Sequence, residues 1–561
     1  MDLTFAYRRP SGVKQNAAGL AISLSPNLRR DRVSFSGQLK DPLRFREAIS
    51  ALHDVVISDL RYQPPDRSAY NAWRESILQQ ESAIRTTAIR ETKTELTARL
   101  AVPMPDGLEE DYRRHRVRYW KARQAYSNHL LKHDRELWRY MMPCDPVITV
   151  TEDSVFFECF SADESSYGCL SVAREAFEHS ETPSLGTTNV DYSWNLYEHF
   201  QRLRSYRETR FEIDPAGFEV QIGDGREHRE EKIDLPNSWL RGFMQMQAAM
   251  SLPLRRLVIA REGVYNLLAF LRRHKASRSP RAVRFELEPG KPPVLVLEPW
   301  EKVISLHSPP YQGTRAETVR VWGRDRLRDL ARQLPLLEQV DVYLLGTGLP
   351  SFWVTRMGEM QMVLGLSGWT TNNWTGASAL TQLLPPVDVG ESQLASIAAT
   401  FRHHPAQSLD EVVRSSDLDQ PTVVAGLNRL ALLGQVIYDL TSARYRWRQV
   451  MPTPLTMEQI GADDVETRMA RELLRGGSIR TTKDEQTSAG LRLLSGAVND
   501  KEVEILLDGD GRIMRGRCHC SHHFQNGLRQ GPCRHLQALR NKVMSPPPAS
   551  SLQDWFDRFR N

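Results

Sequence analysis

Four metal-ligating side chains lie close together late in this 561-residue sequence, in the pattern C-x-C-x12-C-x-H. They are Cys518, Cys520, Cys533 and His535. The other three cysteines, Cys144, Cys159 and Cys169, lie far upstream without comparable spacing. Three thiolates and one imidazole fill a tetrahedral shell, which is the ligand set of a closed structural zinc site. The pattern therefore predicts one structural Zn²⁺, and the filled shell leaves no position for a catalytic water.

The residues before the cluster predict a hairpin that carries its first two ligands. Residues 491–498 and 503–507 are apolar stretches, and residues 512–517 return after an Asp-Gly-Asp-Gly turn. Alternate residues of an extended segment point to the same side, so Cys518 and Cys520 can bind one ion together.

The residues after the cluster predict a helix. Leu536, Leu539 and Val543 recur at helical spacing behind Pro532. This places Cys533 at a helix N-terminus, where the helix dipole favours a thiolate. The expected order of elements is strand, strand, metal, helix.

This arrangement resembles the SWIM zinc finger, which has the pattern C-x-C-x(n)-C-x-H in a ββα context. The resemblance covers residues 490–545 and implies interaction with DNA or protein rather than catalysis. Residues 364–370, Leu-Gly-Leu-Ser-Gly-Trp-Thr, are similar to a segment of large bacterial SWIM-domain proteins. Genes of that family often lie beside genes for AAA+ ATPases and von Willebrand factor A proteins, so the resemblance implies a partner of one of these kinds.

Other interpretations of the cluster remain open. The thiols could be unliganded or could form a disulfide, but the sequence shows no signal-peptide pattern, and a reducing compartment disfavours disulfides. We therefore expect a cytoplasmic protein, and no apolar run is long enough to span a bilayer. His519, His522 and His523 are rival ligands, which we expect outside the shell because four residues already fill it.

The cluster lies in a locally basic stretch. Residues 511–545 contain seven basic residues and no acidic one, although the whole chain carries only +5. Such an excess is the electrostatic footprint of phosphate contact, so the expected nucleic-acid-binding residues are Arg512, Arg515, Arg517, Arg529 and Arg534. The alternative is a solvated arginine-rich face, because no base-reading signature accompanies the charge.

Residues 391–450 predict three helices followed by a strand pair. Ser408 and Asp419 are the expected N-caps of the second and third helices, and Gly434 is expected to end the third. This order resembles a winged helix-turn-helix. In DNA-binding members the third helix enters the major groove. The side chains expected to be exposed there are Gln420, Thr422, Asn428 and Arg429, and the wing offers Arg444, Arg446 and Arg448.

The charge of this region argues against tight phosphate binding. Six arginines balance six acidic residues over 391–450, so the net charge is zero. Winged helices also serve as protein-docking modules. For this region on its own, we favour protein binding slightly over DNA binding.

The length predicts several domains, and we expect an α+β multidomain chain. One helix is expected over 257–273. The expected regions are 1–145, with short strands, a helix and a long helical hairpin over 68–142; 146–390, a mixed α+β scaffold; 391–450, the winged-helix-like domain; 451–545, the zinc-finger region; and 546–561, a tail.

The sequence lacks the complete form of several common enzyme motifs. Residues 365–369 lack the closing glycine of a nucleophile elbow, residues 346–351 lack the third glycine of a dinucleotide fingerprint, and no Walker A sequence occurs. We therefore expect a non-enzymatic zinc-binding adaptor that binds nucleic acid, partner proteins or both. Two alternatives stay open: a protein-docking component of an AAA+ ATPase or von Willebrand A system without nucleic-acid contact, and an enzyme with an unrecognised site in 146–390.

Overall fold

A computed structural model of the chain describes residues 11–15, 19–26, 32–57, 146–161, 166–190, 196–197, 200–206, 208–213, 237–274, 282–345, 350–366, 389–450, 465–486, 491–507, 513–528 and 532–544, with single positions between 111 and 133 and at 551. Residues 1–60 and 143–561 form one compact unit, and residues 61–142 form another. The helical hairpin predicted over 68–142 lies in the second unit, outside the described residues apart from those single positions. The tail, 546–561, lies outside them apart from Ser551.

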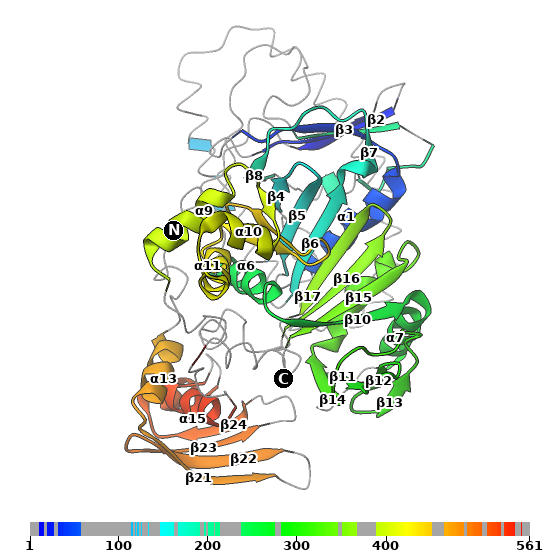
Figure 1. Ribbon diagram of the computed structural model, residues 1–561. Helices are drawn as coiled ribbons and strands as arrows, with labels where there is room; N and C mark the ends of the chain where they lie inside the picture. Colours follow the sequence, from blue (N-terminus) through cyan, green and yellow to red (C-terminus); the bar gives the residue numbers. More distant parts are fainter. Residues whose placement is uncertain are drawn as a thin grey trace. The chain divides into compact units, whose positions relative to one another are not determined.

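The largest sheet described is antiparallel throughout (Figure 1). Strand β17 pairs with β6, so that Leu364 lies opposite Gly168 and two segments far apart in the sequence become neighbours. In spatial order its strands are β10 (Leu254–Ala260), β15 (Gln339–Leu345), β16 (Ser351–Met357), β17 (Met360–Leu366), β6 (Ser166–Ala173), β5 (Ser154–Phe160), β4 (Val147–Val150) and β8 (Gly186–Asn189).

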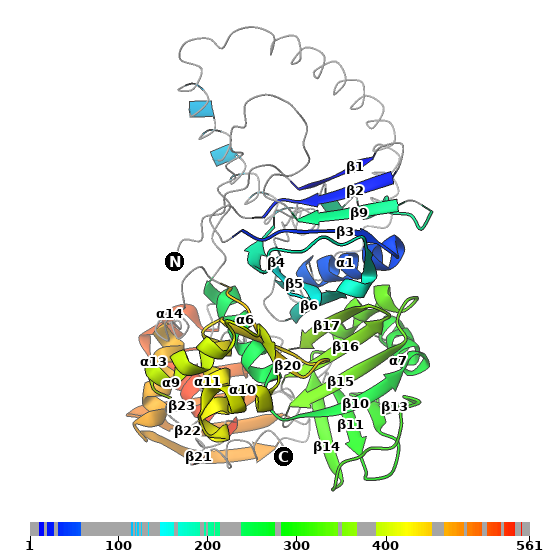
Figure 2. The ribbon, with the colours of Figure 1, turned by 45° about the horizontal axis from the view of Figure 1, so that its top comes forward.

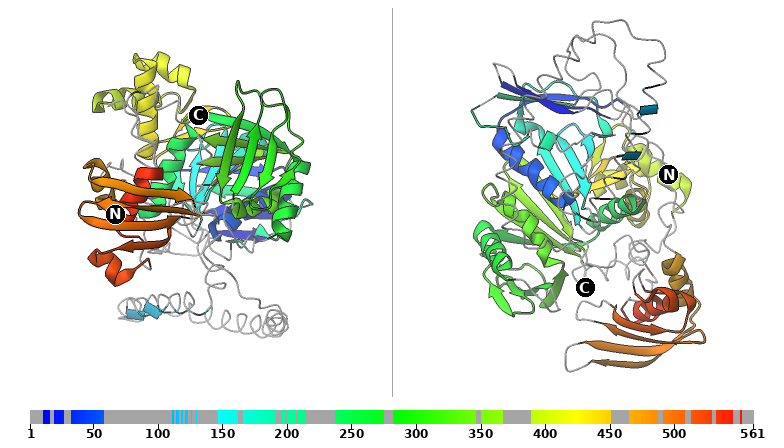
Figure 3. Two further views of the ribbon diagram at one scale, coloured as in Figure 1. Left: turned by 90° about the horizontal axis from the view of Figure 1, so that it is seen from below. Right: turned by 180° about the vertical axis from the view of Figure 1, so that it is seen from behind.

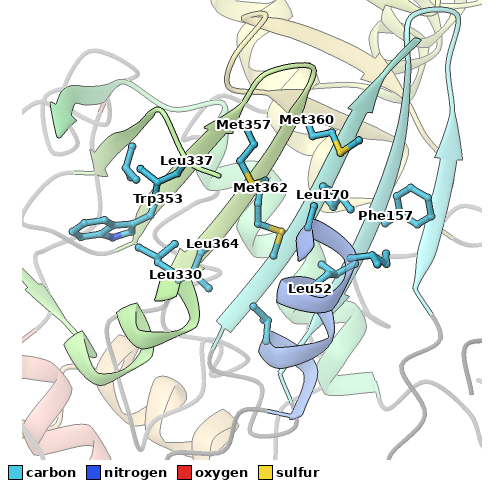
Figure 4. Packing of buried hydrophobic residues seen from close by; sticks show 14 of the residues in the cluster. Leu52, Phe157, Leu170, Leu330, Leu337, Trp353, Met357, Met360, Met362 and Leu364 are labelled. Carbon is cyan, nitrogen blue, oxygen red and sulfur yellow. The ribbon is translucent and has the colours of Figure 1, made fainter. Parts of the chain in front are cut away.

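One face of this sheet packs against helix α1 (Pro42–Ile57) and the 3-10 segment η2 (Arg324–Gln333). Figure 4 shows Leu52 of α1 close to Phe157 and Leu170 of the sheet. All three side chains are at most 1% exposed, and they belong to the largest apolar core of the described residues, which extends into two other sheets.

The opposite face packs against helix α6 (Asn237–Met250), whose Met244 and Met246 join Phe156 and Phe352 in a second core. Because both faces are covered, the central strands β5 and β16 are buried almost throughout, without the alternation of buried and exposed residues of a half-exposed sheet.

The helix predicted over 257–273 is wrong in its first part. Strand β10 includes Leu257–Ala260, and helix α7 begins only at Arg261 (Arg261–Arg273). The β-branched pair Val258 and Ile259 favours extended backbone, and pairing with β15 fixes it there.

Two further sheets flank this core. In the five-stranded sheet, β2 runs parallel to β9, which brings N-terminal strands together with residues beyond the predicted boundary at 145. Its strands in order are β1 (Gly12–Gln15), β2 (Gly19–Leu24), β9 (Glu208–Ile213), β3 (Phe35–Leu39) and β7 (Phe177–Glu178). The four-stranded sheet comprises β13 (Lys302–Ile304), β12 (Val294–Leu297), β11 (Ala282–Leu287) and β14 (Glu317–Trp322).

Residues 389–450, hereafter the helical module, form the predicted three helices and strand pair (Figure 2). Ser408 caps α10 through the Glu411 N–H, whereas Asp419 occupies the N-cap position of α11 without a side-chain capping bond. Gly434 follows α11 with φ of 74°, a left-handed conformation that favours glycine. The elements are α9 (Glu391–Thr400), β18 (Ala406–Gln407), α10 (Leu409–Ser416), α11 (Gln420–Leu432), β19 (Val436–Asp439) and β20 (Arg444–Trp447).

Residues 465–544, hereafter the C-terminal module, contain more structure than the predicted ββα order. Helix α15 lies on one face of a four-stranded antiparallel meander and packs against α13 (Figure 3). The elements are α13 (Val465–Arg475), β21 (Ile479–Gln486), β22 (Arg492–Val498), β23 (Lys501–Leu507), β24 (Ile513–Cys518), α14 (Ser521–Asn526) and α15 (Arg534–Met544).

The described part of the chain is thus mixed α and β, as expected. None of its helices combines the length and the apolar character that crossing a bilayer requires.

Candidate metal centre

Four backbone features bring the predicted ligands together. Cys518 is the last residue of β24, and Cys520 is the N-cap of α14, where its Sγ accepts the His523 N–H at 3.4 Å. Cys533 immediately precedes α15, and its carbonyl accepts the N–H of Gln537 at 3.0 Å. His535 lies in the first turn of α15. The predicted location of Cys533 at a helix N-terminus is therefore confirmed.

The ligand atoms are spaced for one metal ion. One atom from each of Cys518, Cys520, Cys533 and His535 lies within 4.8 Å of all the others. The Cys518 Sγ and His535 Nδ1 are 3.7 Å apart. In a tetrahedral zinc shell with Zn–S of about 2.3 Å and Zn–N of about 2.1 Å, ligand atoms are about 3.6 Å apart. The distance between Cys518 and His535 is close to this value, and the group as a whole is close enough to hold a single zinc ion.

The rival histidines stay outside this group. Within the described ranges, the four predicted residues make up the only set of three or more potential ligands with this spacing. His519 is exposed, and His522 and His523 lie in α14 without joining the set.

The site is part of the core of the C-terminal module. Cys518 is 5% exposed and Cys533 is fully buried, and both belong to the same apolar cluster as Leu536 and Leu539 of α15. Gly516 allows β24 to approach this helix, because a Cβ there would lie 2.8 Å from Leu536 Cδ1. Whatever holds the four ligands together also holds β24 to α15.

Without a cation, the thiols must share protons. A hydrogen bond from Cys533 holds the pKa of Cys518 below its usual value, whereas that bond, together with burial, raises the pKa of Cys533 to about 12. A divalent cation bound by these residues would replace the shared protons and stabilise all three thiolates, and zinc binding to such a site would release protons and be coupled to folding.

A carboxylate from α13 caps the helix that carries two of the ligands. The Oε2 of Glu466 accepts the Arg534 backbone N–H at 2.7 Å, and its Oε1 lies 2.5 Å from Arg534 NH2. Burial opposes ionisation of Glu466, but the hydrogen bonds from Arg534 overcome it and hold the pKa of Glu466 below its usual value. Sequence reasoning missed Glu466, although the spacing of Met469, Ala470 and Leu473 indicates an amphipathic helix around it.

The predicted nucleic-acid residues are placed unequally. Arg512 and Arg529 lie outside the described residues. Arg515 and Arg517 are exposed on β24, where Arg517 lies opposite Glu504 in the strand register. Arg534 is bound to Glu466 and also contacts the sulfur of Met469. The sequence window 511–545 is free of acidic residues, but tertiary structure brings carboxylates beside two of its arginines.

Three side chains predicted to be exposed in the helical module are buried. Asn428 is 1% exposed and donates to the Ala248 carbonyl of α6 at 3.2 Å. Arg446 is 2% exposed and binds Asp153 at 2.6 and 2.8 Å, and Arg448 is fully buried 3.3 Å from Glu158. Those expectations are wrong because the burying partners lie outside residues 391–450: helix α6 covers Asn428, and Asp153 and Glu158, immediately before β5 and within it, pair with the two arginines.

The other expected positions are less enclosed. Gln420 is exposed and Thr422 is half-buried. Arg429 donates to the Val389 carbonyl at 2.7 Å, and Arg444 pairs with Glu411 at 3.2 Å.

No model of a known protein family and no curated protein sequence matches this chain. Among solved structures, proliferating cellular nuclear antigen from Entamoeba histolytica aligns with a TM-score of 0.28 at 10% identity, over 41% of this chain and 91% of that one. PCNA from Thermococcus kodakaraensis gives the same TM-score and identity over 40% and 90%. Likeness at this TM-score does not establish a shared fold.

Proposed function

We propose that this protein is a non-enzymatic zinc-binding adaptor, whose C-terminal module is a SWIM-type finger folded around one structural zinc ion. The observation that carries the proposal is the set Cys518, Cys520, Cys533 and His535, with all four ligand atoms within 4.8 Å. Bound zinc would supply the positive charge that lets three buried thiolates coexist beside an imidazole.

The same residues support a structural rather than a catalytic ion. Four protein ligands complete a tetrahedral shell, so no coordination position stays open for a substrate or water. Two of the ligands lie inside the apolar core, where the ion would join β24 to α15.

Partner proteins are the favoured ligands of this adaptor. If the helical module is a winged helix, α11 is the element that would enter a DNA groove. Packing on α6 buries Asn428 of α11, and acidic partners bind Arg446 and Arg448 at the wing. A DNA-reading role would need these side chains free, whereas docking of a protein on the remaining surface would not. An AAA+ ATPase or a von Willebrand A protein is the partner class that the SWIM resemblance suggests.

Nucleic acid is the second candidate ligand, supported by the exposed Arg515 and Arg517 of β24. Binding to phosphates would weaken steeply with salt, and an Arg515→Ala, Arg517→Ala double variant would reduce the salt slope by about 2. Fluorescence anisotropy with single- and double-stranded DNA over a salt series measures this. Absence of binding at low salt with zinc present removes nucleic acid from the proposal.

Zinc content tests the adaptor's central feature. The full chain should contain one zinc ion per molecule by mass spectrometry under native conditions, and Cys518→Ser should lower that content. Cys169→Ala is the matched control, because Cys169 is also a buried free thiol but lies in the eight-stranded sheet. Full zinc stoichiometry in Cys518→Ser would overturn the ligand assignment.

A further inference from the structure

A cleft of 510 Å³ opens in the C-terminal module beside the four ligands. Residues from α13, the turn that follows it, the turn between β22 and β23, α14 and α15 surround it. They are Met469, Glu472, Leu473, Gly476, Ser478, Asn499, Cys520, Ser521, His522, Arg534 and His535. Nine of the eleven lining residues are not metal ligands, so the proposed zinc centre accounts for only part of the lining.

The charge of the lining favours a cation. Arg534 is the only arginine or lysine among the lining residues, and its Nε and NH2 both bind Glu466 while its NH1 contacts Met469 Sδ. Glu472 is exposed and adds one negative charge. A zinc shell of three thiolates and a neutral imidazole adds about one more.

The shape of the lining favours a long aliphatic stem. Met469 and Leu473 are four residues apart on α13, so they form an apolar strip on one helix face, and Glu472 is adjacent to it. A lysine side chain has the matching form, with methylene groups that lie along apolar surface and an ammonium group that reaches a carboxylate.

We propose that this cleft binds a lysine side chain presented by a partner protein. The proposal rests on the zinc-loaded finger of the proposed function and specifies the chemistry of its partner: a segment with an exposed lysine.

The test uses methyl NMR of the zinc-loaded full chain labelled with [¹³C-methyl]methionine. Met469 lines the cleft and reports on its occupancy, and Met469→Leu assigns its signal. Met514 is 55% exposed in the same module but outside the lining, so its signal reports on non-specific binding. The probes are N-acetyl-lysine methylamide, the same compound acetylated at Nε, and N-acetyl-glutamate methylamide.

We expect the lysine compound to shift the Met469 signal in a saturable way, with no shift of the Met514 signal. The acetylated and acidic compounds should leave both signals unchanged. Glu472→Gln should weaken the affinity about two- to five-fold, as expected for loss of an exposed ion pair. Glu502→Gln, an exposed carboxylate on β23 outside the cleft, should leave the affinity unchanged.

Two results overturn the lysine site while the zinc centre stands: no Met469 shift in protein that contains one zinc per chain, or equal shifts with the acetylated or acidic compound. Protein that binds less than one zinc per chain under saturating metal instead overturns the proposed function, and the lysine site falls with it.

Discussion

The C-terminal module and the eight-stranded sheet bury charged groups in different ways. In the module, three cysteines and one histidine converge with no arginine or lysine among them, so in the proposed zinc centre the ion would neutralise the thiolates. On the α6 face of the sheet, Glu158 is fully buried with side chains of the chain itself: Arg448 at 3.3 Å, Tyr167 at 2.7 Å and Gln247 at 2.9 Å.

This difference determines what each region depends on. The module has a small apolar core, and two of its ligands, Cys518 and Cys533, are members of that core. The sheet has cores on both faces and uses the Glu158–Arg448 pair to join the helical module to it. We therefore expect the stability of the module to depend on metal binding. The stability of the sheet should depend only on contacts between residues of the chain.

Removal of zinc should have the largest effect. A chelator such as EDTA should unfold the C-terminal module, because structural zinc contributes on the order of 10 kcal/mol to the folding of such domains. Hydrogen exchange followed by mass spectrometry should show loss of protection in residues 465–544 and unchanged protection in residues 147–173. Loss of protection in both segments would contradict the proposed independence of the two regions.

Glu158→Ala should have the next largest effect and should act on the sheet. It leaves Arg448 buried without its carboxylate, which typically costs about 3–5 kcal/mol. Urea denaturation should show that the free energy of unfolding of the sheet falls by this amount. The zinc content of the variant should equal that of the wild type. Glu359→Ala is the control, because Glu359 pairs with Arg44 at 2.9 Å but is 48% exposed, and such a pair contributes about 1 kcal/mol or less.

Glu466→Gln should have the smallest effect and should act on the module. The substitution weakens a charged cap at the start of α15. We therefore expect the free energy of unfolding of residues 465–544 to fall by about 1–3 kcal/mol. Because the pKa of Glu466 is lowered below 4.5 in the folded protein, its stabilisation is complete above 4.5 and is lost only as the pH falls through the lowered value. The difference from wild type should therefore be equal at pH 7 and pH 5.5. A difference that grows as the pH falls from 7 to 5.5 would mean that the pKa is raised instead.

Much of the candidate site follows from local sequence. The spacing of Cys518 and Cys520, the helical pattern after Pro532 and the position of Cys533 before α15 are all properties of short segments. The strands at 492–498 and 501–507 and the caps of the helical module at Ser408 and Gly434 belong to the same class. Each of these features depends on hydrophobic periodicity or on the backbone preference of one residue. Both can be read from residues that are close together in the sequence.

Local sequence was therefore enough to predict the candidate ligand set, the elements that carry it and the mixed α and β character of the described chain. The partners of the charged side chains depend instead on packing between distant segments: Glu466 for Arg534, Asp153 for Arg446 and Glu158 for Arg448. The same kind of packing pairs β17 with β6 and covers Asn428 with α6. The candidate ligands are close together in the sequence, so their spacing can be recognised there. The partner of a buried charge comes from a distant segment that the packing of the cores brings beside it.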